Sequence, residues 1–312
     1  MTSIFLVVDN NFYPYTQHLP HALQYYYWCI DKILSSKNYN YIVGIRTTYA
    51  VGKEFISNFI TKIKEHFPDI QFSNKNNLLL PKNKKIPFEI YSRRDFFYKN
   101  VEIMTPTINT ENTKNKQNKF ELLKWFSNPD TSKIIRTKLC GPDKFRETPT
   151  IGLINRQNTR ILKNSKEIVK NMRNIGFNIE EVFFEDKSFE FQINFFNSHD
   201  IIIAPHGAAL SGIPFMQDYG LVIEIANEEW IPYRYFSGIS ISTNKSHCIV
   251  CQNHPFPHWQ KEEVGKIRRL RNKMLDIFVE PKEVVACIKD FINHRYKIYE
   301  EKAPDKVFIQ LR

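Results

Sequence analysis

The sequence has little cysteine and no long hydrophobic run. Its five cysteines are an odd number among 312 residues and form no dense framework, which predicts a reducing compartment rather than a disulfide-rich secreted protein. No window of about 18 apolar residues occurs, so no segment is long enough to span a bilayer. The stretch after Met1 also lacks the basic start and the length of a signal peptide. We therefore expect a cytoplasmic protein with no transmembrane segment or membrane anchor.

Motifs for nucleic-acid recognition are missing as well. The net charge of +11 suits an anionic partner, which could be nucleic acid, an acidic membrane surface or a nucleotide diphosphate. The sequence has no RNA-recognition, zinc-finger or helix-turn-helix signature, and its basic residues are scattered apart from small groups at Lys82–Lys85 and Arg268–Arg271. Scattered charge is typical of solvated loops, so we expect no nucleic-acid partner.

Strands and helices alternate along the chain, which has enough length and hydrophobic content (42%) to fill two domain cores. In the first half, apolar periodicity predicts strands at 4–8, 41–45, 78–80, 88–91 and 101–104 and helices at 18–35 and 52–67. In the second half it predicts strands at 151–155, 179–184, 201–204, 221–225 and 247–250 and helices at 165–175, 189–197, 232–239, 262–278 and 281–300. This alternation indicates α/β domains with parallel sheets. Proline and glycine cluster over 128–150, where we place the domain boundary.

Residues 200–226, DIIIAPHGAALSGIPFMQDYGLVIEIA, are the most informative stretch. Ile201–Ala204 reads as a buried parallel strand that Pro205 ends, and small or polar residues follow at the expected start of a helix. Ligands bind at the carboxyl ends of such strands, where a helix start presents N–H groups to an anion. A second apolar strand, Leu221–Ile225, carries Glu224 near the same edge.

This stretch resembles the signature of family 61 glycosyltransferases: His-Gly-Ala-small-Leu, then Phe215-Met216 and a Val-x-Glu-Ile strand. Upstream, residues 151–164 resemble the family's strand followed by Arg-x3-Arg-x3-Asn, and residues 189–196 resemble its next helix. The resemblance implies a GT-B-like α/β fold, in which two Rossmann-like parallel-sheet domains face a cleft. Residues 1–145 would bind the acceptor, 146–280 would bind the nucleotide-sugar donor, and the helix in 281–312 could return to the first domain.

The resemblance also implies an enzyme: an inverting glycosyltransferase that moves a sugar from a UDP-sugar, such as UDP-GlcNAc or UDP-xylose, to a hydroxyl of a glycan or glycoprotein. The departing diphosphate gains negative charge, which a protein can stabilise with a metal held by an Asp-x-Asp pair or with a helix start and arginines. No two aspartates stand two apart in this sequence. We therefore expect metal-independent transfer with no cofactor beyond the donor.

The predicted donor site combines the arginine motif with the His-Gly-Ala turn. Its members are Arg156, Arg160, Asn164, His206, Gly207, Ala208, Ala209, Leu210 and Glu224. The arginines and Asn164 would share one face if their loop leads into a helix, although Asn164 could instead cap that helix. The alternatives are that the arginines lie on a solvated face and that His206 bridges two loops. Glu224 could contact a ribose or sugar, cap a helix or pair with Arg234.

A base must take the proton from the acceptor hydroxyl. The family resemblance implies a histidine and a carboxylate at the start of an early helix, where this chain has His18 and His21, after Asp9. We name these three residues as catalytic candidates, while the histidines could equally well only open an amphipathic helix. The carboxylate is not cleanly matched, so the alternative function is a catalytically inactive nucleotide-binding or glycan-binding protein on the same fold.

Two further features bear on the ligands. The family usually has glycine at the position of Ala209 and Thr-Asn at Ser211-Gly212, which leaves the donor sugar open. Cys248, Cys251, His254 and His258 form C-x2-C-x2-H-x3-H, a spacing that resembles a zinc site. However, the first two cysteines fall in a predicted strand, where residues three apart face opposite sides. We therefore predict no metal site.

Overall fold

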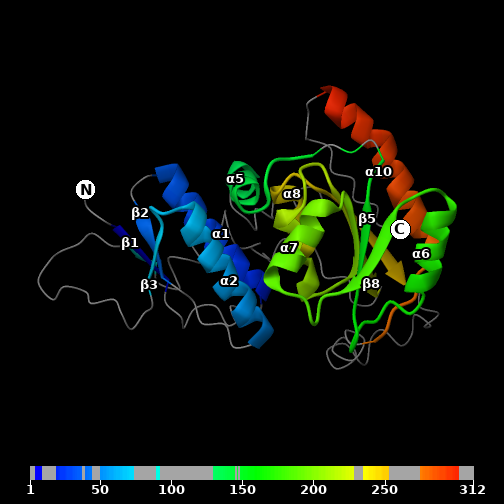
Figure 1. Cartoon of the computed structure of the whole chain (residues 1–312), viewed down its shortest axis with the longest axis horizontal. Helices are drawn as coiled ribbons and strands as arrows, with labels where there is room; N and C mark the ends of the chain where they lie inside the picture. The colour runs from blue at the N-terminus through cyan, green and yellow to red at the C-terminus, as the bar shows by residue number, and fades with distance from the viewer. Residues whose placement is uncertain are drawn as a thin grey trace, which may run out of the picture. The chain divides into compact units, whose positions relative to one another are not determined.

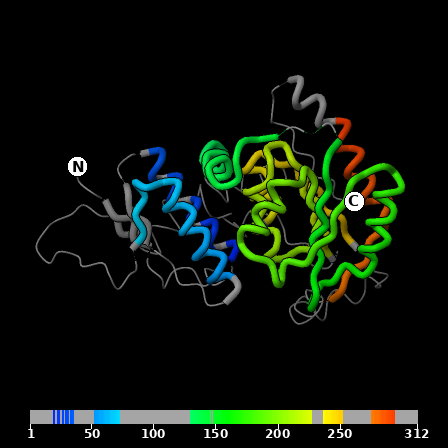
Figure 2. The backbone as a smooth tube through the Cα atoms, in the orientation of Figure 1, coloured from blue at the N-terminus to red at the C-terminus, as the bar shows by residue number. Residues whose placement is uncertain are grey.

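The computed structural model describes residues 4–8, 19–36, 39–43, 50–73, 89–91, 129–144, 146, 148–227, 235–252 and 275–301, which are drawn in colour in Figure 1. Figure 2 traces the backbone in the same orientation. The chain divides into two compact units, Met1–Pro142 and Asp143–Arg312. Each unit contains a parallel sheet and is described here by itself. The α/β class predicted from the sequence is confirmed, and the GT-B arrangement of the two units stays a prediction.

The first unit is a parallel sheet with helices. It contains β1 (Ile4–Val8), α1 (Leu19–Ser36), β2 (Tyr39–Val43), α2 (Ala50–His66), β3 (Gln71–Ser73), β4 (Glu89–Tyr91) and α5 (Pro129–Cys140). The strand order is β3-β2-β1-β4, with every neighbouring pair parallel. Helices α1 and α2 share buried aromatic rings, because Tyr27 stacks on Phe59 with ring centroids 5.7 Å apart. The strands predicted at 78–80 and 101–104 lie outside the described residues.

Helix α5 is a correction to the sequence analysis, which treated this segment as part of an irregular domain boundary. Pro129 occupies the first helical position, where its missing N–H costs nothing, and Asp130 lies in the first turn. Gly141 follows the helix with a φ of +91°, the left-handed conformation that glycine adopts readily. Proline at the start and glycine at the end therefore bound a helix here, rather than marking a loop.

The second unit is built on five parallel strands. It contains β5 (Ile151–Asn155), α6 (Ser165–Asn174), β6 (Ile179–Phe183), α7 (Phe189–Ser198), β7 (Ile201–Pro205), the 3-10 helix η3 (Ala208–Phe215), β8 (Leu221–Asn227), α8 (Tyr235–Ser242), β9 (Ser246–Gln252) and α10 (Pro281–Glu301). The sheet order is β6-β5-β7-β8-β9. These elements confirm the predicted alternation within a few residues at each end, and Ser188 caps α7 by accepting a hydrogen bond from the Phe191 N–H.

Helices cover both faces of this sheet, with α6 and α10 on one side and α7 on the other (Figure 1). Because side chains alternate along a strand, Ile201, Ile203 and Ile223 join the core under α6 and α10. Ala204 and Glu224 are paired residues on the opposite face. That face is packed by α7, η3 and α8, where Gly212 lies so close to the Phe196 ring that a Cβ would come within 2.1 Å of it. Gly212 thus allows η3 to pack on α7.

The segment before α10 differs from the helix predicted at 262–278. Of that range the structure describes residues 275–278, which are extended, and Ile277 forms a parallel bridge with Leu162. Backbone bonds join Lys163 N–H to Ile277 C=O (2.9 Å) and Ile277 N–H to Ile161 C=O (2.8 Å). Pairing with the loop after β5 therefore takes precedence over helix formation in these residues.

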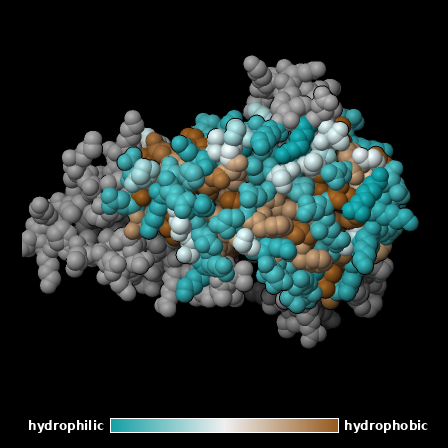
Figure 3. All heavy atoms as spheres, in the orientation of Figure 1, coloured by the Kyte–Doolittle hydropathy of each residue, from teal (hydrophilic) through white to brown (hydrophobic). Residues whose placement is uncertain are grey.

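A disulfide also differs from the expectation of reduced cysteines. Cys248 on β9 is bonded to Cys287 on α10, with their Cα atoms 6.5 Å apart. None of the described helices is long and apolar enough to cross a bilayer. In the view of Figure 3, hydrophilic side chains cover most of the described surface, with hydrophobic residues scattered among them.

Candidate functional site

The strand order places a topological switch point between β5 and β7. Strand β5 is followed in the chain by β6 on one side of it, whereas β7, β8 and β9 extend the sheet on the other side. The connections therefore leave the carboxyl ends of β5 and β7 in opposite directions, and ligands of open α/β sheets bind in the crevice that this creates. The predicted donor residues follow these two strands.

Asn155, the last residue of β5, organises the loop that carries both arginines. Its side-chain oxygen accepts from the Arg156 N–H (2.8 Å) and from the Leu162 N–H (2.9 Å), while its amide donates to the Leu162 carbonyl (3.2 Å). The side chain is buried, at 4% exposure. One amide thus closes a loop of six residues, and the sequence analysis missed this role because an asparagine at a strand end carries no distinctive pattern.

Arg156 and Arg160 converge on a single acceptor, the carbonyl oxygen of His206. Arg160 Nη1 donates to it at 2.7 Å and Arg156 Nη1 at 3.4 Å. Neither guanidinium forms an ion pair with a carboxylate of the described residues. Burial lowers the pKa of Arg156, although Glu185 opposes the shift. Burial and the neighbouring Arg156 lower the pKa of Arg160 to about 10. Two partly buried positive charges therefore lie together without an ion-pair partner among the described residues, which is an electrostatic arrangement that favours an anion.

The backbone of Arg160 is unusual, since its φ of +57° lies in the left-handed region. For a residue with a Cβ this conformation costs roughly 1 to 2 kcal/mol. The arginine motif therefore does not continue into a helix, and Arg160 and Asn164 do not share a helical face. Instead, the turn at Arg160 brings its guanidinium to the His206 carbonyl.

Gly207 lies against the arginine pair. A Cβ at this residue would come within 2.4 Å of Arg156 Nη1, so the absence of a side chain makes room for the guanidinium. The helix η3 starts at the next residue, with Ala208 exposed and Ala209 half-buried. The first turn of a helix has N–H groups without intrahelical partners. Leu210 is fully buried and anchors this turn in the core.

His206 and Glu224 form a buried pair behind the turn. His206 Nδ1 and Glu224 Oε1 are hydrogen-bonded, and His247 Nε2 lies 3.0 Å from Glu224 Oε2. Burial alone would raise the pKa of Glu224, but the hydrogen bonds from His206 and His247 lower it to about 2. Glu224 is therefore ionised and only 1% exposed, and both of its oxygens face histidines. Its described contacts are with these two histidines, and its contact with a ribose or sugar stays a prediction.

Comparison with known proteins places this site in a family. A model of the family described as Glycosyltransferase 61 matches residues 17–223, about two thirds of the chain. The chain belongs to glycosyltransferase family 61. It is therefore a glycosyltransferase, whose substrates are a nucleotide sugar and an acceptor. A search of curated proteins found no match. A solved structure, a putative D-3-phosphoglycerate dehydrogenase from Ralstonia solanacearum, is 9% identical over 98% of this chain and 96% of its own, but its TM-score of 0.26 is too low to support a conclusion.

The remaining predicted residues of this family 61 enzyme fall into two groups. Asn164 is buried and serves the packing of the loop, because its amide donates to the Val279 carbonyl at 2.8 Å and makes no cap bond to α6. The catalytic candidates His18 and Asp9 lie outside the described residues, as does the side chain of His21. Their roles stay predictions.

Two residues connected to the buried pair were missed by the sequence analysis. His247, which contacts Glu224, was read only as part of a strand. Ser240, whose Oγ lies 2.9 Å from His247 Nδ1, falls one residue beyond the helix predicted at 232–239. The family model ends at residue 223, so Glu224 and both of these residues lie beyond it. In the sequence, these three residues stand out only as polar residues within otherwise apolar strands and helices.

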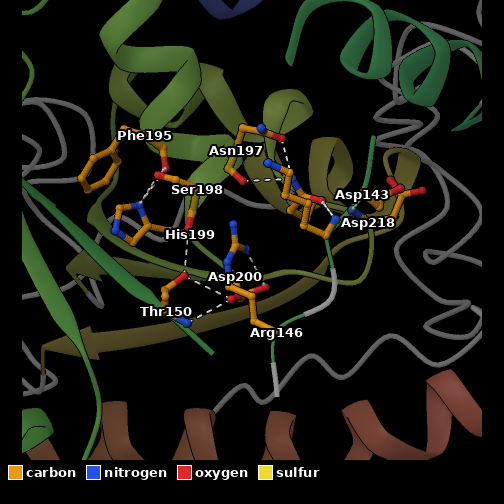
Figure 4. Close-up of polar contacts among 11 residues, drawn as sticks. Asp143, Arg146, Thr150, Phe195, Asn197, Ser198, His199, Asp200 and Asp218 are labelled. Carbon is orange, nitrogen blue, oxygen red and sulfur yellow. Dashed lines mark hydrogen bonds and ion pairs between the residues drawn. The ribbon is translucent and has the colours of Figure 1, made fainter. Parts of the chain in front are cut away.

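The opposite, amino edge of the same sheet holds a second polar cluster (Figure 4). Asp200 accepts from the Thr150 N–H (3.0 Å) and the Thr150 hydroxyl (3.1 Å), and Arg146 lies 3.4 Å away. Asp218 pairs with Lys245 at 3.3 Å, and its N–H donates to the Asp143 carboxylate. The cluster thus fastens the segment before β5 to the sheet of the glycosyltransferase.

No group of three or more histidine, cysteine or acidic side chains in the described part of the chain could hold a metal ion. Of the zinc-like spacing noted in the sequence, Cys248 is in the disulfide, and His254 and His258 lie outside the described residues.

Proposed function

We propose that this glycosyltransferase transfers its sugar from a UDP-sugar, such as UDP-GlcNAc or UDP-xylose, with inversion and without a metal, to a hydroxyl of a glycan or glycoprotein. The second unit would bind the donor and the first would bind the acceptor. The observation that carries the proposal is the convergence of Arg156 and Arg160 on the His206 carbonyl at the start of η3.

The charge balance at this edge supports a diphosphate ligand. Two guanidiniums lie within hydrogen-bond distance of one carbonyl oxygen, and the exposed start of η3 offers further N–H donors beside them. A bound diphosphate would supply the missing negative charge and would accept charge-assisted hydrogen bonds from both arginines. An anion here would also raise the pKa of Arg160 towards its ordinary value.

The same groups suit the chemical step. As the bond from the anomeric carbon to the donor phosphate breaks, negative charge builds up on the diphosphate, and donors that are already in place stabilise that charge without reorganisation. A fixed pair of arginines can do this without a metal. The bond to the acceptor oxygen forms on the opposite side of the sugar, which inverts the anomeric carbon.

The acceptor proton needs a base in this proposal. His18 is the first candidate, with His21 and Asp9 after it, since in the sequence Asp9 comes directly after β1 and the histidines stand at the start of α1. A base with the ordinary pKa of histidine would make the rate fall below about pH 6.5.

The test is a product assay. The purified enzyme is incubated in EDTA with each UDP-sugar and a panel of hydroxyl acceptors, while UDP release and the anomeric configuration of the product are followed by NMR. We expect transfer with inverted configuration in EDTA. Retention of configuration, or activity only after a divalent cation is restored, would contradict the proposed mechanism.

The sequence analysis placed the protein in the cytoplasm, and we retain that location as a proposal. The Cys248–Cys287 disulfide is the observation that opposes it, because disulfides persist mainly in oxidising compartments. Counting the reactive thiols in protein isolated from its native cells decides between the two locations. All five cysteines would react if every one is reduced, and three would react if this disulfide has formed.

A further inference from the structure

A chain of hydrogen bonds crosses one face of the sheet strand by strand, from near the amino end of β9 to the carboxyl end of β7. It starts at Ser240 on α8, passes through His247 on β9 and Glu224 on β8, and reaches His206 just after β7. The carbonyl of His206 then receives the two arginines that follow β5. The network therefore connects four neighbouring strands of the sheet, and only its last members are proposed to touch the donor.

Strand register explains why His247 reaches Glu224. The parallel pairing sets His247 beside Val222 and Ile249 beside Glu224. Because side chains alternate, His247 and Glu224 point to the same face, whereas Cys248 points to the face covered by α10. His247 is fully buried, so both of its ring nitrogens must find hydrogen-bond partners inside the protein.

Glu224 depends on both histidines. A carboxylate that is 1% exposed loses its hydration, and this loss must be offset by donors. Since the carboxylate is ionised, it can only accept hydrogen bonds. The proton of each bond therefore lies on the histidine, on Nδ1 of His206 and on Nε2 of His247. Without His247, Oε2 would have no donor among the described residues, and Glu224 would take up a proton or turn away from its present position.

Helix α8 holds the two ends of the network. The Phe236 ring packs edge-on against the His206 ring, with centroids 5.0 Å apart. One turn later, Ser240 bonds to the Phe236 carbonyl and contacts His247 Nδ1. His206 is also fixed through its backbone, because its N–H donates to the Ile225 carbonyl at 2.8 Å. Among the described residues, Glu224 and α8 are therefore the links through which a change at His247 can reach His206.

We propose that His247 is a positioning residue for the donor site: through Glu224 it fixes His206, and with it the carbonyl on which Arg156 and Arg160 converge. The inference rests on the proposed donor site, although the coupling between the two histidines does not. His247 acts as an N–H donor to Glu224. Glutamine, whose amide can reach Glu224, should therefore preserve this function, whereas leucine should abolish it.

The first experiment titrates UDP into the full chain in EDTA by calorimetry. His247→Leu should weaken UDP binding by about 10-fold to 100-fold, by analogy with the loss seen when residues that orient metal-binding side chains are removed. His247→Gln should bind close to the wild-type affinity. Val250→Ala is the matched control, because Val250 lies on the same strand but packs in the core under α10. It should lower the unfolding temperature and leave UDP affinity unchanged.

The second experiment needs no ligand. In NMR spectra of protein with labelled histidine, the His206 Nδ1 proton shared with Glu224 should exchange slowly in the wild type, in His247→Gln and in Val250→Ala, and its signal should be lost in His247→Leu. If His247→Leu does not fold, His247→Asn replaces it, because its shorter amide cannot reach Glu224.

The outcomes separate the two claims. Failure of the wild type to bind UDP would remove the proposed donor site, while the NMR signals would still show whether His247 holds His206. Wild-type UDP affinity in a folded His247→Leu protein, an unchanged His206 signal in that variant, or equal loss of affinity in Val250→Ala would overturn the positioning role.

Discussion

The two edges of the second unit's sheet use charge in opposite ways. At the amino edge each buried carboxylate has a cation beside it, as in the pairs Asp200–Arg146 and Asp218–Lys245. At the carboxyl edge, Arg156 and Arg160 lie together with no ion pair to a described carboxylate. The buried Glu224 is hydrogen-bonded to two histidines instead of to an arginine. Charge at the amino edge is balanced within the protein, which suits a structural role. Charge at the carboxyl edge has no ion-pair partner among the described residues, which suits the proposed donor site.

The largest effect on stability is expected at the amino edge. Asp200→Ala removes the carboxylate beside Arg146 and the acceptor of the Thr150 N–H, while the Thr150 hydroxyl keeps its bond to the Ser198 carbonyl, so the free energy of unfolding should fall by about 3 kcal/mol. Urea unfolding measures this loss. UDP affinity under native conditions should stay at the wild-type value, and a parallel loss of affinity would show that the two edges are not independent.

Acid should destabilise the two edges in different pH ranges. Burial lowers the pKa of His199 at the amino edge, opposed by its hydrogen bond to the Phe195 carbonyl and by Glu180. Since the unfolded state then binds the proton more tightly, stability falls as the pH drops below about 6.5. The pKa of Glu224 is about 2 in the folded protein against 4.5 unfolded, so its contribution is present above pH 4.5 and is lost between pH 4.5 and 2. That loss is on the order of 3 kcal/mol.

Single variants separate these ranges in urea unfolding at several pH values. His199→Asn should remove the dependence near pH 6, and Glu224→Gln should remove the dependence below pH 4.5. If Glu224→Gln leaves the acid range unchanged, Glu224 is not held ionised by its two histidines.

Gly207→Ala tests the close approach at the carboxyl edge. The added Cβ would meet the end of a flexible arginine, so Arg156 can swing away at little cost in stability. UDP affinity should fall by about 10-fold, the loss of one charge-assisted hydrogen bond, as measured by calorimetry. An unchanged affinity would mean that Arg156 does not contact the ligand from its present position.

The smallest effect concerns the backbone of Arg160. Arg160→Gly and Arg160→Ala both remove the guanidinium, but only glycine accepts a φ of +57° without strain. The glycine variant should be more stable than the alanine variant by about 1 kcal/mol in urea unfolding. Both should lose the same UDP affinity. Equal stabilities would contradict the strained backbone at this residue.

The sequence predicted the parts of the fold that depend on local periodicity. The buried strand before the His-Gly-Ala turn, its partner at 221–225 and the alternating helices were all visible, because apolar runs and Ser188 as a cap are short-range signals. Helix α5 could also have been found from Pro129 and Gly141, since proline first and glycine last bound a helix as well as a loop. The family resemblance was confirmed by the match over residues 17–223.

The parts that were missed depend on long-range geometry. His247 meets Glu224 across 23 residues of sequence, and only the β8–β9 register decides that they share a face. Cys248 and Cys287 are 39 residues apart. The left-handed turn at Arg160 is likewise imposed by its surroundings, because arginine has no preference for that conformation. Sequence reasoning thus named the residues of the proposed donor site but not the network behind them.

The central claim is that the unbalanced charge of Arg156 and Arg160 binds the diphosphate of the donor. Calorimetric titration of UDP in EDTA tests it most directly, with the Arg156→Ala/Arg160→Ala double variant compared with Arg146→Ala, which removes a guanidinium from the amino edge. We predict metal-free UDP binding by the wild type and by Arg146→Ala, and a loss of about 100-fold or more in the double variant. Wild-type UDP affinity in the double variant, or binding that requires a divalent metal, would contradict the account.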